Sequence, residues 1–173
     1  MHPINRRSVV LFLPLGMAIL WKPRLAWSQQ ASPAAVAASV RKASKDAEAS
    51  LLRQLKLDEQ LPPEQRTSQR YVSCVARALD GYAAALQTIA PTLPVHVQAL
   101  PTIVAQTAQA VHSSRTPAAA SAAMTAAIGE VRKTLELIKA DDPPLARAEI
   151  SEVRSVDETL SFLNDKLVKA TGI

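Results

Sequence analysis

The stretch TSQRYVSCVARALDGYAAALQTI, from Thr67 to Ile89, decides the fold of this chain. Its larger apolar residues recur at alternating steps of three and four, and they are Val72, Val75, Leu79, Tyr82, Leu86 and Ile89. This spacing places them on one stripe of an α-helix, which is the pattern of a helix that packs lengthwise against other helices. The sequence therefore predicts a bundle helix here.

The same periodicity continues on both sides of this stretch. It predicts helices over residues 33-57, 63-89, 94-113, 117-140 and 143-170, with a kink or a break at Pro101, which falls inside the third. Links of only a few residues favour consecutive helices that lie antiparallel. We therefore expect an all-α, antiparallel up-and-down bundle of four to five helices, formed by a single domain over residues 29-173.

Residues 1-28 have the three parts of a signal peptide. Arg6 and Arg7 precede an apolar run, and small residues then lead to an expected cleavage between Ser28 and Gln29. The paired arginines also resemble the twin-arginine export signal. An uncleaved anchor that uses Trp21 and Trp27 at the membrane interface is the alternative. The segment predicts a bacterial periplasmic or secreted protein that meets the membrane only during export.

The positive charge of the chain comes from this N-terminal segment. The formal net charge is +5, but four of the 20 Lys and Arg residues precede residue 29, which leaves 16 basic against 15 acidic residues. A nucleic-acid-binding protein carries a basic surface over its folded domain. We therefore expect no nucleic-acid partner.

Cys74 is the only cysteine and the candidate free thiol. It begins a row of small residues with Ala78, Gly81 and Ala85, a spacing that we expect to allow another helix to approach closely. A buried, inert thiol fits this row. An inter-subunit disulfide and a reactive thiol are the alternatives.

The remaining chemistry-bearing residues form no recognisable catalytic or metal-binding pattern. His96 and His112 lie too far apart on the predicted third helix to share one metal ion, and Met124 is not in register with either for haem. The carboxylates of the last helix are expected to form a solvated face with ion pairs to Arg147 and Arg154; they are Glu149, Glu152, Asp157 and Glu158. We therefore expect no enzyme activity, no cofactor and no metal.

A nearly uncharged hairpin is the best candidate for function. Between Gly81 and Gly129 the only charged residue is Arg115. The candidate interface residues of this 94-129 segment are uncharged: the third helix carries Gln98, Thr102, Gln106 and Gln109, and the alanine-rich start of the fourth carries Ala119, Ala122 and Ala126. Either the hairpin is an inner layer that other helices cover, or it is a docking surface for a protein partner or a homodimer.

The leading functional hypothesis is therefore an exported, non-enzymatic helical bundle that acts as a binding, adaptor or structural module. The alternative is a periplasmic carrier of a small ligand or cofactor, held in a cavity that the kink at Pro101 opens.

Overall fold

The computed structural model describes residues 32–141 and 146–173, and these residues form five α-helices and no strand. The all-helical prediction is therefore confirmed for this part of the chain. The signal segment and its cleavage site at Ser28 and Gln29 lie outside the described residues. The helices are α1 (Pro33–Asp58), α2 (Ser68–Ile89), α3 (Leu100–Ser113), α4 (Pro117–Asp141) and α5 (Ala146–Thr171). Three short 3-10 turns lie between them: η1 (Pro63–Gln65), η2 (Ala90–Thr92) and η3 (Val95–Val97).

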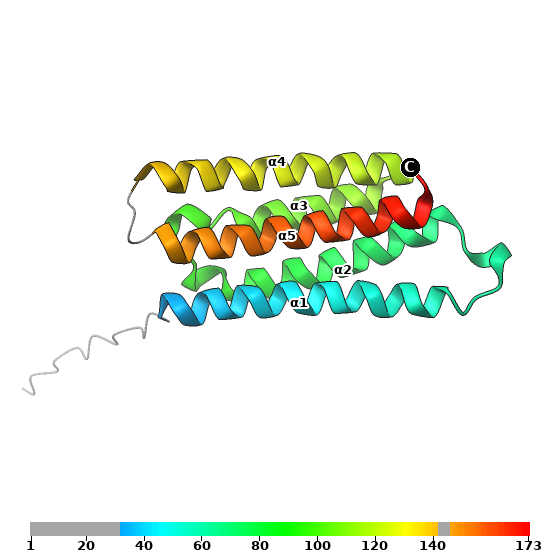
Figure 1. Ribbon diagram of the computed structural model, residues 1–173, viewed down its shortest axis with the longest axis horizontal. Helices are drawn as coiled ribbons and strands as arrows, with labels where there is room; N and C mark the ends of the chain where they lie inside the picture. The colour runs from blue at the N-terminus through cyan, green and yellow to red at the C-terminus, as the bar shows by residue number, and fades with distance from the viewer. Residues whose placement is uncertain (1–31, 142–145) are drawn as a thin grey trace, which may run out of the picture.

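The five helices lie side by side along the long axis of the molecule (Figure 1). Each helix packs against the next one in the chain, and α5 also packs against α1, which closes the ring. Further contacts join α2 to α4 and α5. Each helix in this arrangement has an inner face toward the other helices and an outer face toward solvent.

The apolar stripe that runs from Val72 to Ile89 forms the inner face of α2. Five of its six residues are at most 1% exposed, and Ile89 packs partly buried against them. The corresponding stripes of the other four helices complete one continuous core. Because burying a large apolar side chain contributes about 1.5–3 kcal/mol, this core accounts for why the helices stay together.

Hydroxyl side chains cap three helices at their starts. Ser32 Oγ accepts from the Ala35 amide at 3.3 Å and begins α1, and Thr116 Oγ1 accepts from the Ala119 amide at 3.2 Å and begins α4. At the start of α2, Thr67 Oγ1 accepts from the Arg70 amide at 3.3 Å. Such caps satisfy amides that have no partner within the helix. The predicted start of the second helix at residue 63 is therefore wrong, because Pro63 begins only a 3-10 turn and Thr67 caps the helix proper.

The predicted 94-113 segment does not form one helix, and of the kink or break expected at Pro101 the structure has a break, which lies just before Leu100. The α-helix begins at Leu100, and residues 95–97 form a separate 3-10 turn. A helix running through Pro101 would bring the proline ring against the carbonyl four residues earlier. With the helix beginning at Leu100, Pro101 lies in the first turn, where its missing N–H leaves no hydrogen bond unmade. The kink that was to open a ligand cavity does not exist.

The small-residue row of α2 is only partly a packing surface. Cys74 and Ala78 are buried, whereas Gly81 is exposed. No atom lies within 4 Å of the position that a Gly81 Cβ would take. The expected close approach of another helix therefore does not occur at Gly81, which faces out of the core, whereas Ala85 is again partly buried against it.

Candidate functional site

The seven residues predicted as an interface are all exposed. They define what we call the hairpin surface: Gln98, Thr102, Gln106, Gln109, Ala119, Ala122 and Ala126. Gln98 lies between η3 and α3, and the other six lie opposite the buried stripes of α3 and α4, where they form outward-facing rows on neighbouring helices. The explanation that other helices cover this hairpin is therefore wrong, because α3 and α4 occupy the ring and not its centre.

An open groove of about 610 Å³ adjoins this surface, between α4 and the end of α5. Two of the seven residues, Ala122 and Ala126, line it. The others that line it are mostly apolar or small: Ala118, Ser121, Thr125, Val168 and Ile173. Because Ile173 is 50% exposed, this groove presents apolar area to solvent.

Charged residues border the hairpin surface without entering it. At the α2 side, His112 Nε2 lies 2.6 Å from Asp80 Oδ2. Farther along α4, Lys133 Nζ lies 2.7 Å from Glu130 Oε1. The uncharged surface is therefore a bounded patch in a bundle whose other outer faces carry Lys, Arg, Asp and Glu.

Cys74 is buried and forms no disulfide. It lies beside the carboxylate of Asp58, the last residue of α1. Its thiol donates to Asp58 Oδ2 at 3.3 Å, and the other oxygen, Asp58 Oδ1, accepts from Arg70 Nε at 2.7 Å. Burial, followed by this hydrogen bond and the Asp58 charge, raises the pKa of Cys74 to about 11. A thiol held in this form is a poor nucleophile, because the thiolate is the reactive species.

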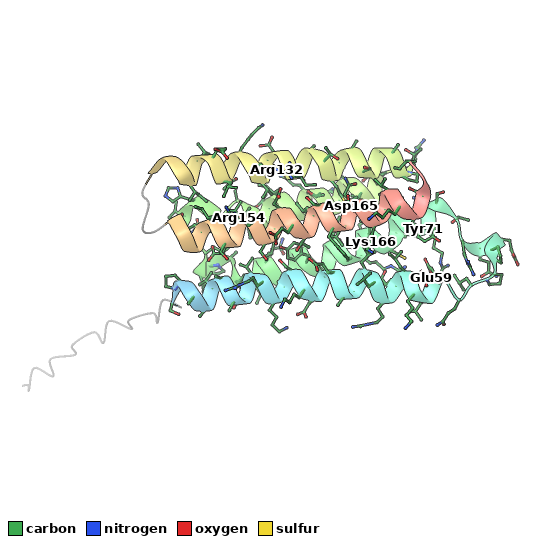
Figure 2. The ribbon with its side chains drawn as sticks, in the orientation of Figure 1. Glu59, Tyr71, Arg132, Arg154, Asp165 and Lys166 are labelled. Carbon is green, nitrogen blue, oxygen red and sulfur yellow. The ribbon has the colours of Figure 1, made fainter. Side chains whose placement is uncertain are left out.

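The solvated position expected for the α5 carboxylates is wrong for Glu152, whereas Glu158 is exposed as expected. Glu152 is completely buried, and both of its carboxyl oxygens lack a hydrogen-bond partner among the described residues. Burial, with a smaller contribution from the Glu149 charge, raises the pKa of Glu152 to about 7. Asp157 pairs with Arg132 of α4 at 2.8 Å, and Arg132 is labelled on that helix in Figure 2. The partner of Asp157 therefore comes from tertiary packing against α4.

A cluster of hydroxyl groups lies where α1, α2 and α5 meet. Tyr82 Oη of α2 lies 2.8 Å from Ser44 Oγ of α1, and Ser155 Oγ of α5 donates to the same Ser44 oxygen at 3.0 Å. One turn further along α5, Thr159 Oγ1 donates to Glu48 Oε1 at 3.3 Å. Ser44, Tyr82, Ser155 and Thr159 are buried. Sequence reasoning missed this cluster, although Ser44 and Thr159 lie beside the apolar stripes of their helices.

The hydroxyl cluster forms the floor of a groove of about 420 Å³ between α1 and α5. Ser44, Ser155 and Thr159 line it from the core side. The rest of its lining is mainly charged or polar: Arg41, Lys45, Glu48, Ile150, Ser151, Arg154 and Glu158. This groove contains none of the predicted site residues.

Among the side chains that the structure describes, residues 32–138 and 149–173, no three His, Cys, Asp or Glu gather to hold a metal ion. His112 instead pairs with Asp80, while His96 lies exposed in η3. In the same described part of the chain, no helix combines the length and apolar character that a membrane span requires.

Comparison of the chain with protein families, with curated proteins and with solved structures finds no match.

Proposed function

We propose that this chain is an exported, non-enzymatic, antiparallel up-and-down bundle that acts as a binding module, and that the hairpin surface binds a second copy of the chain. The observation that carries the proposal is the exposure of all seven hairpin residues in a segment whose only charge is Arg115. An outer bundle face normally carries many charges, and a lack of charge is typical of the centre of an interface.

Charge complementarity favours a second copy as the partner. A strongly charged partner would find no opposite charge on this surface, so electrostatics would neither steer nor orient it. Two identical uncharged surfaces, by contrast, meet about a twofold axis without repulsion between like charges. The alanine row of α4 also lets the partner's backbone come close, since alanine extends only a methyl group from the helix.

A matched set of lysine variants tests self-association. We expect the exported protein to show a dimer fraction that rises with concentration in sedimentation equilibrium. Ala119→Lys and Gln106→Lys should shift the protein to monomer, because each would place two like charges at the interface. Ala49→Lys changes an exposed alanine on α1 in the same way and should leave the dimer unchanged.

A protein that stays monomeric at all concentrations would overturn self-association. Equal loss of dimer in Ala49→Lys would also contradict it, since the effect would then come from net charge and not from the hairpin surface.

Export rests on the composition of the N-terminal segment. Both tryptophans, Trp21 and Trp27, precede the proposed cut between Ser28 and Gln29. Protein isolated from the periplasm should therefore emit only tyrosine fluorescence. Tryptophan emission from that fraction would show that the segment is retained, as an anchor would be.

The carrier alternative loses its proposed cavity, because Pro101 lies at the start of α3 and no kink opens there. No other observation on the hairpin favours it.

A further inference from the structure

We infer that the groove between α1 and α5 is a binding site for a small polar ligand that carries an anionic group next to an amine or hydroxyl donor. This inference goes beyond the proposed self-association, since the groove lies between helices other than the hairpin pair.

Three cations line the groove without an ion-pair partner. Arg41 and Lys45 come from neighbouring turns of α1, and Arg154 comes from α5. None of the three forms an ion pair with any residue of 32–141 or 146–173. Figure 2 labels Arg154 on α5, the helix that lies beside α1. The groove thus gathers positive charge from both of its walls.

Other exposed cations, such as Arg53 and Lys56, also form no ion pair, so the groove differs in bringing three such cations to one recess. Elsewhere on α1, Lys42 pairs with Asp46 at 2.6 Å, so the helix does form ion pairs where a carboxylate is suitably placed. On α5, Asp157 precedes Glu158 in the chain and already forms an ion pair with Arg132. Arg41 and Lys45 are like charges four residues apart on one helix face, a spacing that destabilises a helix. A bound anion would relieve that repulsion.

The floor supplies fixed polar atoms, which distinguishes the groove from a merely charged surface. The Ser155 hydroxyl donates to Ser44 and therefore still has lone pairs that can accept a hydrogen bond. Ser44 is itself held by Tyr82 from inside the core. Because these side chains are buried, their positions are set by packing before any ligand arrives, which reduces the entropy lost on binding.

The two acids of the groove define the second part of the ligand. Glu48 already accepts from Thr159, and Glu158 is exposed at the rim. Carboxylates accept hydrogen bonds but donate none when ionised, so they suit an amine or hydroxyl. With three cations and two acids, the groove fits an anion with an adjacent donor better than it fits a simple cation. A volume of about 420 Å³ is within the range of small-molecule sites.

Titration with three probes tests the site: inorganic phosphate, phosphoserine and glutamate. We expect saturable shifts of the backbone amide signals of Ser44, Ser151 and Ser155 in ¹⁵N-labelled protein, at probe concentrations up to about 10 mM. Tighter binding of phosphate and phosphoserine than of glutamate would identify a phosphate ligand, and the reverse order a carboxylate. Shifts that stay linear for all three probes would overturn the inference.

A pair of charge-matched double variants separates the site from general electrostatics. Arg41→Gln with Arg154→Gln should weaken binding by about tenfold or more, because each removes charge-assisted hydrogen bonds. Arg53→Gln with Lys56→Gln removes the same charge from exposed positions of α1 outside the groove and should leave affinity unchanged. Equal weakening in both double variants would overturn the inference. Ala119→Lys should retain binding, so a failure of self-association would not remove this site.

Discussion

The hydroxyl oxygen of Tyr82 lies 2.8 Å from Oγ of Ser44, and this contact joins α2 to α1 inside the core. Ser155 of α5 donates to the same serine, so one small hydroxyl group connects three helices. Burial raises the pKa of Tyr82 to about 12, although hydrogen bonds with Ser44 and Thr159 oppose this shift. The phenol is therefore neutral and available as a hydrogen-bond donor across the physiological range.

The Tyr82–Ser44 contact should contribute measurably to stability. Tyr82→Phe keeps the ring in the core and removes only the hydroxyl, so we expect a loss of about 1 kcal/mol in the free energy of unfolding. Ser44→Ala should cost slightly more, because it also leaves Ser155 without its acceptor. Urea denaturation of both single variants and the double variant gives the coupling energy. If the losses in the free energy of unfolding of the two single variants sum to that of the double variant, the two hydroxyl groups do not act together.

Glu152 should make the protein less stable as the pH rises. Its pKa is raised from 4.5 to about 7 in the folded chain, so the fold favours the protonated carboxyl. The contribution of Glu152 to stability is therefore highest below about pH 4.5, falls between about 4.5 and 7, and is constant above. Over this range the loss is of the order of 2–3 kcal/mol.

Glu152→Leu isolates this effect, since leucine is apolar and similar in size. The variant should be more stable than the original chain, and by a larger margin at pH 8 than at pH 5, in urea denaturation at the two pH values. A margin for Glu152→Leu that is equal at both pH values would contradict the raised pKa.

Periodicity predicted the helices and their inner faces because both depend on local spacing. Val72, Val75 and Leu79 are buried as their spacing predicts, since any helix that packs lengthwise must bury its apolar stripe. The predicted third helix begins too early, because its apolar spacing continues from Leu93 through Val97 although the α-helix begins only at Leu100. An apolar pattern alone does not distinguish a 3-10 turn from the first turn of an α-helix.

The hydroxyl cluster could not be predicted because its members are distant in the chain. Ser44 is 38 residues from Tyr82 and 111 residues from Ser155, and only the closed ring of helices brings them together. The burial of Glu152, by contrast, is indicated by its spacing in the sequence. Glu152 lies four residues before Val156, so it falls on the apolar stripe of α5, but its charge suggested a solvated position. The exposure of the hairpin residues likewise depended on where α3 and α4 lie in the ring.

Cys74 should not react with thiol reagents while the protein is folded. The thiol is buried, and its pKa of about 11 leaves very little thiolate at pH 8. We expect a chromogenic disulfide reagent to label the Cys74 thiol only as fast as the protein unfolds. Non-reducing denaturing electrophoresis should show a single monomer band. An Ala49→Cys variant in a Cys74→Ala background provides an exposed thiol on α1, which should react within the mixing time. Equally fast labelling of Cys74 would show that the helices open there.

Gly81→Ala should stabilise the protein by about 1 kcal/mol, because alanine is the better helix former and the added methyl group meets no atom within 4 Å. Gly172 provides the contrast, since its φ of 72° lies in the left-handed region that a side chain disfavours. Gly172→Ala should therefore be neutral or destabilising, although the space around it is also open. Urea denaturation of the two variants compares these effects directly. If Gly81→Ala were destabilising, another helix would have to approach α2 at this position after all, as the small-residue row first suggested.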